Sequence, residues 1–246
     1  MQRYFTTQAA QLGQTVTLTG EAAHHLQRVM RAQVDDQVEI VTASQQAYRA
    51  KVVALQAETV SLQLQAELPS TEMARRVLIA CGIPKKTKAD WIVQKGTELG
   101  AAGFIFFASQ YGIAKWPPQR QAKKLVRLRK IALEAARQAH RNVIPTVTIV
   151  ASLNAVCQLE KDRGIVAYEE SGKQGEHARL RQTAQQMQSD QTLIAVFGPE
   201  GGLAPEEVSQ LKQADFVSAG LGPRILRAET APLYLLSALS TLWELR

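Results

Sequence analysis

The chain has 246 residues, and its 29 lysines and arginines outnumber 22 aspartates and glutamates to give a formal net charge of +7. Hydrophobic residues at 46% and charged residues at 21% are ordinary globular values, which excludes disordered, collagenous and coiled-coil chains. No apolar run is long enough to cross a bilayer, the first residues lack the pattern of a signal peptide, and two cysteines are too few for a disulfide framework or a zinc site. We therefore expect a cytoplasmic α/β protein without a metal ion or a membrane partner.

Residues 1–70 predict a small, largely antiparallel β-barrel. Apolar and polar side chains alternate with the period of a half-buried strand in three segments: Val16–Leu18, Val38–Ile40 and Val60–Leu64. One helical segment, Glu21–Met30, interrupts them. His24 and His25 within it have no cysteine or carboxylate at metal-ligand spacing, so we expect them to pack or to face solvent. Barrels of this size often bind nucleic acid.

After Pro69, strand-like runs alternate with helical segments, which predicts a mostly parallel sheet covered by helices on both faces over residues 71–246. The expected strands are Val77–Ile83, Phe104–Ala108, Val147–Val150, Ile165–Tyr168, Leu193–Phe197 and Phe216–Ala219. The expected helices are Ala89–Leu99, Gln119–His140, Leu153–Leu159, Ala178–Gln188, Pro205–Gln213 and Thr230–Leu245. Gly100 follows the first of these helices in the position of a C-terminal cap.

The excess of positive charge lies in the middle third of the chain, where residues 71–150 carry fifteen basic and four acidic side chains. Helical spacing puts six of these cations on one face: Arg120, Lys123, Arg127, Lys130, Arg137 and Arg141. Apolar side chains suited to packing on a sheet lie on another face: Leu125, Leu128, Ala132, Ala135 and Ala139. The basic face either contacts the phosphates of a polyanion or is simply solvated, with its stems covering apolar surface.

Two glycine-bearing loops follow expected strands near the C-terminus, Phe197–Leu203 and Gly220–Thr230. Glycines permit positive φ and let backbone amides approach a ligand closely. Neither loop is a P-loop or a dinucleotide fingerprint. The alternative to a binding role is a pair of tight structural turns.

The sequences of these loops, GPEGG followed by LGPRILRAETA, resemble the C-terminal signature of the RsmE family of SPOUT-class RNA methyltransferases. Weaker similarities extend along the chain at Arg3–Phe5, Ala23–Leu26, Val29–Arg31, Lys95–Gly100, Gln138, Arg141 and Pro145. The resemblance implies a PUA-like barrel and a C-terminal α/β domain with a trefoil knot, an exception to the rule that chains do not thread themselves. It also implies a homodimer with active sites at the subunit interface.

The resemblance implies S-adenosyl-L-methionine as cofactor and methylation of the N3 nitrogen of a specific uridine in 16S ribosomal RNA of the small subunit. The cofactor contacts carried over are Tyr168, Glu169, Phe197, Gly198, Gly201, Gly202, Leu221, Gly222, Ile225 and Leu226. The RNA contacts expected are Arg3, Arg31, Arg120, Lys123, Arg127, Lys130 and Arg137. A non-catalytic RNA-binding or ribosome-assembly factor of the same fold is the alternative, and the basic middle third disfavours an enzyme of small-molecule nucleotide metabolism.

The imide nitrogen of uridine is a poor nucleophile until it loses its proton, so the site needs a base or a cation that stabilises the developing imidate. We expect Arg227 and Arg141 to supply the cation. Glu229 either acts as the base or orients Arg227, and Glu200 is a weaker candidate for the base.

The chain also departs from the family pattern. Gln110 and Tyr111 replace an expected Glu-Arg pair, Arg137 replaces a glutamate, and Asp35 replaces a turn glycine of the barrel. Ala204 replaces a hydroxyl residue, which removes a side-chain helix cap worth about 1 kcal/mol. The last helix is apolar over much of its circumference, which fits either a core helix or a symmetric interface.

Overall fold

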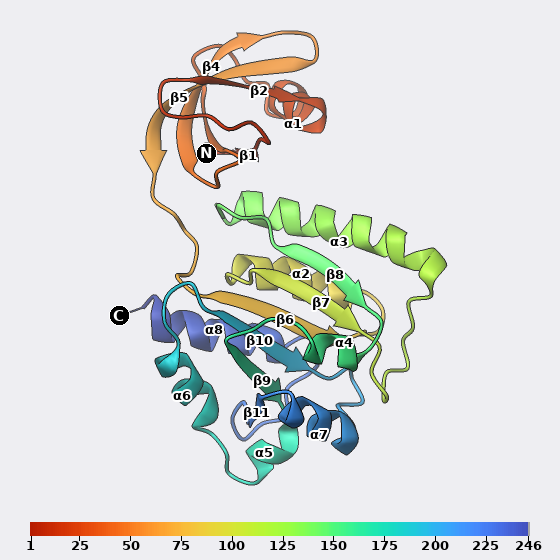
Figure 1. Cartoon of the computed structure of the whole chain (residues 1–246). Helices are drawn as coiled ribbons and strands as arrows, with labels where there is room; N and C mark the ends of the chain where they lie inside the picture. Colours follow the sequence, from red (N-terminus) through yellow and green to blue (C-terminus); the bar gives the residue numbers. More distant parts are fainter. Residues whose placement is uncertain (246) are drawn as a thin grey trace. The chain divides into compact units, whose positions relative to one another are not determined.

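The computed structural model describes residues 1–245, and the chain forms two compact units (Figure 1). The first unit combines Met1–Glu72 with Ala136–Val143, and the second combines Met73–Ala135 with the chain from Ile144 onwards. Residues 136–143, which belong to the expected domain 71–246, group by their contacts with the first unit. Each unit is described by itself below.

The first unit is a curled five-stranded sheet with the order β1-β3-β4-β5-β2 (Figure 1). Its strands are β1 (Arg3–Phe5), β2 (Thr15–Thr19), β3 (Gln37–Val41), β4 (Ala47–Leu55) and β5 (Thr59–Leu68). All neighbouring pairs are antiparallel except β1 with β3, so the expected antiparallel character is confirmed. The alternating residues of β5, from Val60 to Leu64, point into the core because every second side chain of a strand faces the same side.

The helical segment of this unit divides into α1 (Gly20–His24) and a π-helical turn (His25–Val29). His25 Nδ1 lies 3.0 Å from the hydroxyl of buried Tyr4, which agrees with the expected packing role of this histidine. Asp35, where a turn glycine is common, adopts a φ of 77°. Aspartate is one of the few side-chain-bearing residues that visit this region readily, which explains how the turn survives the replacement.

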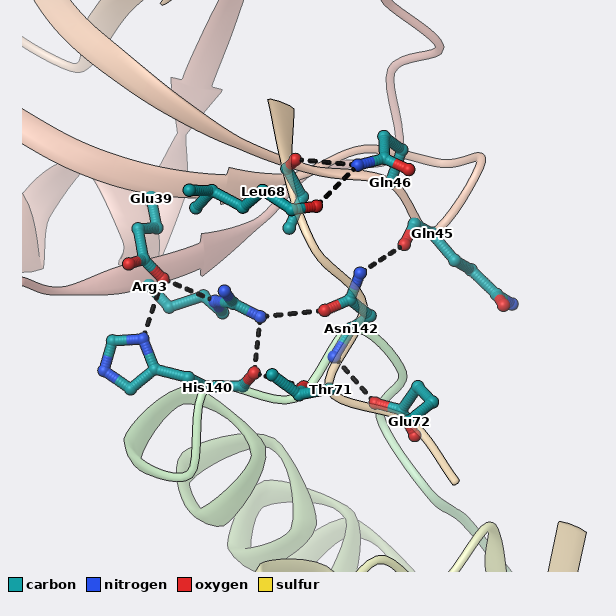
Figure 2. Close-up of polar contacts among 10 residues, drawn as sticks. Arg3, Glu39, Gln45, Gln46, Leu68, Thr71, Glu72, His140 and Asn142 are labelled. Atoms are coloured by element: carbon teal, nitrogen blue, oxygen red, sulfur yellow. Dashed lines mark hydrogen bonds and ion pairs between the residues drawn. The ribbon is translucent and has the colours of Figure 1, made fainter. Parts of the chain in front are cut away.

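The C-terminal end of α3 (Pro118–Gln138) is held within the first unit by a polar network (Figure 2). Helix α3 ends two residues before the expected His140, which takes a φ of 53°. The amides of His140 and Arg141 donate back to the carbonyls of Arg137 and Ala136, at 3.3 and 2.9 Å, in the pattern of a Schellman cap. A histidine in this conformation is strained, and the interactions of its carbonyl and ring offset that cost.

Arg3 is the centre of this network. Its Nε donates to Glu39 at 2.8 Å, and one terminal nitrogen donates to the carbonyl of His140 at 2.5 Å and to Asn142 at 3.0 Å (Figure 2). His140 Nδ1 lies 2.7 Å from the same carboxylate. Burial alone raises the pKa of Glu39, but the bonds from His140 and Arg3 bring its net pKa below the usual range. Arg3 is only 3% exposed, so the structure does not support the prediction that it contacts RNA.

Glu72 binds the residues that follow α3. Its carboxylate accepts two bonds from Nε of Arg141, at 2.9 and 3.0 Å, and a shorter contact from the terminal nitrogen of that guanidinium. It also accepts the amides of Asn142 and Val143, at 2.7 and 3.1 Å. Arg141 is 3% exposed and lies beyond the helix, so it belongs neither to the basic face predicted for α3 nor to the expected catalytic group.

Replacing Glu72 with alanine is expected to lower the free energy of unfolding by about 3 kcal/mol, because a buried guanidinium loses its carboxylate. Glu72→Gln, which keeps an oxygen for the amide of Asn142, should lose less. Urea unfolding of both variants measures the difference. Wild-type stability in Glu72→Ala would show that this carboxylate does not hold the end of α3.

The second unit contains a six-stranded parallel sheet with the order β11-β9-β10-β6-β7-β8. Its strands are β6 (Arg76–Gly82), β7 (Gly103–Phe107), β8 (Thr146–Val150), β9 (Arg163–Ala167), β10 (Thr192–Phe197) and β11 (Phe216–Ala219). All six strands fall where the sequence predicted them, because buried parallel strands are nearly continuous apolar runs bounded by polar residues. The trefoil knot stays a prediction.

Helices cover both faces of this sheet and bury separate clusters. Helices α2 (Lys88–Glu98), α3, α6 (Arg179–Gln186) and α8 (Ala231–Trp243) pack on one face, against side chains such as Ile79 and Phe104. Helices α4 (Leu153–Cys157) and α7 (Pro205–Gln213) pack on the other, against the alternate residues of the same strands, such as Ala80 and Ile105. A short helix that the sequence did not predict, α5 (Glu169–Lys173), follows β9.

The predicted cap at Gly100 is confirmed. This residue has a φ of 90°, and the amides of Gly100 and Ala101 donate to the carbonyls of Thr97 and Gly96. Both cysteines are buried and free. Among residues 1–245 no helix is long and apolar enough to span a membrane, and no three His, Cys, Asp or Glu side chains gather as a metal site.

Candidate functional site

The carboxyl ends of β9, β10 and β11 meet at one edge of the sheet, where the loops that follow them surround a cavity of about 750 Å³. Parallel sheets bind ligands at this edge. The cavity wall includes the ten residues that the resemblance assigned to the cofactor: Tyr168, Glu169, Phe197, Gly198, Gly201, Gly202, Leu221, Gly222, Ile225 and Leu226. Arg227 lines it as well. The structure thus brings both glycine-bearing loops to one pocket.

The first loop, which follows β10, folds back tightly on itself. The amide of Gly202 donates to the carbonyl of Pro199 at 2.9 Å, and Gly202 has a φ of 74°. A Cβ on Gly198 would lie 2.6 Å from the carbonyl carbon of Gly202 and 2.9 Å from the amide nitrogen of Leu203. Because these neighbours are backbone atoms, only glycine fits at position 198 without opening the loop.

The second loop, which follows β11, is hydrogen-bonded to the side chain of Glu176. One carboxylate oxygen of Glu176 accepts the amide of Gly220 at 2.8 Å, and the other accepts the amides that begin α6. Burial alone raises the pKa of Glu176, but these backbone donors bring its net pKa below the usual range. A Cβ on Gly172 would meet the carbonyl of Gly222 at 3.1 Å, so α5 also packs closely on this loop.

Lys88, the first residue of α2, joins the two loops. Its Nζ lies 3.0 Å from Oε1 of Glu200 in the first loop and 2.9 Å from Oε2 of Glu229 in the second. The amide of Lys85 donates to the same oxygen of Glu200 at 3.0 Å. Partial burial raises the pKa of both carboxyls, but hydrogen bonds and the charge of Lys88, together with Arg227 for Glu229, bring each net pKa below its usual range. The bond to Glu229 in turn raises the pKa of Lys88, against partial desolvation.

Replacing Lys88 with methionine is expected to raise the pKa of Glu200 and of Glu229, because both lose their shared cation. A carboxyl whose pKa is lowered by folding stabilises the protein above about pH 4.3, its unfolded value, and loses that contribution as the pH falls through the folded value. Lys88→Met should therefore be less stable than wild type above pH 4.3, and it should lose less stability than wild type as the pH falls below that value. Carboxyl NMR titration and unfolding across this range measure both effects, with Lys86→Met as the matched control. Unchanged titrations would show that Lys88 does not hold the loops.

Tyr111 lines the pocket and belongs to the loop after β7, which is bound by Glu207 of α7. The buried carboxylate of Glu207 accepts the hydroxyl of Ser109 at 3.1 Å and the amide of Gln110 at 2.9 Å. It also accepts the amide of Ala204 at 2.9 Å. The helix that lost its hydroxyl cap at Ala204 therefore still has one half of a capping box, supplied from within its first turn. A Cβ on Gly201 would lie 3.0 Å from the carbonyl of Tyr111, so this departure from the family pattern borders the site itself.

The cations predicted on α3 do not share one environment. Arg120, Lys123, Arg127 and Lys130 are exposed within the second unit, and Arg127 bonds Asp90 of α2 at 2.6 Å. Arg137 is half-buried in the first unit, with its guanidinium 5.8 Å from the centre of the Tyr4 ring. The apolar face of the helix is confirmed, since Leu128, Ala132 and Ala135 are buried. Arg31 in the first unit is exposed, with a φ of 54°.

Helix α8 buries one side in its own unit and leaves another side partly open. Leu235, Leu236 and Leu239 are fully buried, whereas Tyr234 is 41% exposed. The expected core role is therefore confirmed for part of the circumference, and the symmetric interface stays a prediction.

Sequence reasoning missed the three residues that tie the pocket together, Lys88, Glu176 and Glu207. A signal was available for Lys88, since it follows the end of β6 at the same edge of the sheet as both glycine loops. Spacing alone did not indicate its partners, because Glu200 and Glu229 belong to distant segments.

A family model described as the RNA methyltransferase domain matches residues 71–240, and one described as the RNA methyltransferase PUA domain matches residues 18–65. The chain is 44% identical to Ribosomal RNA small subunit methyltransferase E of Bacillus subtilis, over all of its own length and 98% of that protein.

Two crystal structures have a similar fold. One, described as a hypothetical protein, has a TM-score of 0.92 and 38% identity, with 99% of each chain covered. The other is Ribosomal RNA small subunit methyltransferase E from Neisseria gonorrhoeae bound to S-adenosyl methionine, with a TM-score of 0.83, 25% identity, and 99% and 98% of the two chains covered. The fold and the pocket thus define an RNA methyltransferase with a PUA domain. Within that class, the chain belongs to the RsmE family, the ribosomal RNA small subunit methyltransferases E, as its motifs indicated.

Proposed function

We propose that this protein transfers a methyl group from S-adenosyl-L-methionine to the N3 nitrogen of a uridine in 16S ribosomal RNA. The observation that carries the proposal is the convergence of both glycine-bearing loops on one pocket, in a chain that is 44% identical to a named member of the family over its whole length. A ribosomal RNA substrate would make the cytoplasm the place of action.

The pocket fits the cofactor in size and in chemistry. Its volume of about 750 Å³ suits a nucleoside-sized ligand, and the close-packed Gly198 leaves backbone rather than side chains at the wall. Apolar Leu221, Ile225 and Leu226 offer a surface for the adenine ring, and Glu169, the first residue of α5, offers a carboxylate for the ribose hydroxyls. The bound cofactor supplies an activated methyl group on a sulfonium.

Arg227 and Glu229 of the second loop are the residues that we assign to activation of the uridine. A uridine imide placed near Arg227 would lose its proton more readily, because the guanidinium stabilises the negative charge that develops on the imidate oxygens. Glu229 is a poor base, since the cation of Lys88 lowers its pKa. Of the two roles open to Glu229, we therefore favour the orientation of Arg227. Arg141 takes no part, since it is buried against Glu72.

The expected homodimer and the RNA-binding surfaces form part of the same proposal. The partly open side of α8 is the surface we assign to a second copy of the chain, and the exposed cations Arg31, Arg120, Lys123, Arg127 and Lys130 are those we assign to RNA phosphates. Sedimentation as a 27.0 kDa species at micromolar concentration would contradict the dimer.

Two measurements test the proposed activity. Calorimetric titration with S-adenosylmethionine should show micromolar binding, and incubation of the protein with small ribosomal subunits and labelled cofactor should place label on one uridine of the 16S RNA. Mass spectrometry of the digested RNA locates the methyl group on the base. Cofactor binding without methyl transfer to subunits or to naked RNA would overturn the proposal, and absence of cofactor binding would favour a non-catalytic assembly factor.

A further inference from the structure

An exposed tryptophan lies on α2, one helical turn after Lys88 of the pocket wall. Trp91 is 50% exposed, which is unusual for so large an apolar side chain on a helix that buries its opposite face. Lys88, Trp91 and Lys95 follow helical spacing along one face of α2, and Lys88 is part of the pocket wall. The face that carries Trp91 therefore begins at the site itself.

One cation lies beside the indole ring, and a second cation bonds the residue before it in the chain. Lys95 Nζ lies 5.5 Å from the ring centre, in the geometry of a cation–π contact, and Glu98 holds the same ammonium at 2.8 Å. On the neighbouring helix, Arg127 bonds Asp90, the residue before Trp91, at 2.6 Å. This bond places Arg127 of α3 next to the turn of α2 that carries the tryptophan.

We infer that Trp91 is a stacking platform for a base of single-stranded RNA whose phosphates contact the cations of α3. An exposed aromatic face beside a basic track is the arrangement that binds single strands, because any base can stack on the ring while cations hold the backbone. Trp91 lies one helical turn after Lys88 of the pocket wall, and the neighbouring Asp90 bonds Arg127 of α3. A base on Trp91 would thus neighbour the nucleotide that enters the pocket. The inference deepens the proposed function, since it names how the substrate strand is held.

The test uses the full-length protein without cofactor, with a twelve-nucleotide oligouridylate and an abasic strand of the same length as probes. Trp91→Ala should weaken oligouridylate binding about ten-fold, while Trp91→Phe, which keeps a stacking ring, should bind within about three-fold of wild type. All three proteins should bind the abasic strand equally. Fluorescence anisotropy of end-labelled probes at low salt measures each affinity.

Tryptophan fluorescence gives an independent readout. Of the three tryptophans, Trp116 is 8% exposed and Trp243 is only partly exposed, so Trp91 at 50% is the most accessible to a base. Unlabelled oligouridylate should quench the emission of wild type but not that of Trp91→Phe.

Three results would overturn the inference: equal oligouridylate affinity of wild type and Trp91→Ala, quenching that persists in Trp91→Phe, or failure of wild type to bind oligouridylate at low salt. Sedimentation of Trp91→Ala tests a fourth result that would overturn it. If Trp91→Ala changes the association state, the surface is an interface between copies rather than an RNA site. Methylation of small subunits by wild type is measured separately, so failure of the proposed function and failure of this inference are distinguishable.

Discussion

Gly198→Ala is expected to abolish detectable binding of S-adenosylmethionine, with an affinity loss of at least about 100-fold. The added methyl group would lie 2.6 Å from the carbonyl carbon of Gly202, a distance that no Cβ tolerates, and the neighbour is backbone that cannot rotate away. The loop must therefore open, which changes the shape of the pocket wall. Calorimetric titration of the variant measures the loss.

A folding defect could produce the same result, so a second variant is needed. Ile225 lines the pocket and is 71% exposed, so Ile225→Asp places a charge on the wall without disturbing the core. This variant should also lose binding while keeping the unfolding temperature of wild type. As a control for the glycine change, Gly13→Asn has open space around the new side chain and a φ of 84° that asparagine tolerates. Wild-type affinity in Ile225→Asp would show that the cofactor does not bind in this pocket.

The positions of the pocket residues could be predicted from the sequence because each carries its own structural signal. Gly198, Gly202 and Gly222 lie in the loops that follow apolar strands, and parallel strands place such loops at one edge of a sheet. Helix α7 has the bounds that the sequence predicted, since Pro205 suits its first turn. In these cases the local residue and the global fold demand the same conformation.

The contacts that fasten those loops could not be predicted, because each joins segments far apart in the chain. Nothing in the run around Lys88 indicates that its ammonium meets Glu200 and Glu229, and the charge pattern of α3 gave no warning that Arg141 would be buried. The end of α3 shows the same limit. Gly100 predicts a cap because glycine adopts positive φ without strain. His140 takes the equivalent conformation because Arg3 and Thr71 bind its carbonyl.

Arg227→Ala is expected to lower the rate of uridine methylation by about 100- to 1,000-fold, the usual effect of removing one donor that stabilises a developing anion. Cofactor affinity should stay within about three-fold of wild type, because in this proposal the guanidinium faces the acceptor base. Arg227→Lys keeps the charge but not the planar fork, and should recover part of the rate. Single-turnover methylation of small subunits, with calorimetry for the cofactor, separates the two effects.

The pH profile distinguishes this role from a merely structural one. The reactive form of uridine lacks its imide proton, so the rate rises with pH until that proton is lost. A cation beside the base lowers the pKa of the imide, and its removal must therefore shift the rising limb to higher pH. Arg224, which also lines the pocket, provides the matched control: Arg224→Ala should leave the limb in place. If both alanine variants shift the rising limb equally, the net charge of the loop matters rather than the position of Arg227. If neither variant shifts it, another group stabilises the negative charge of the imidate.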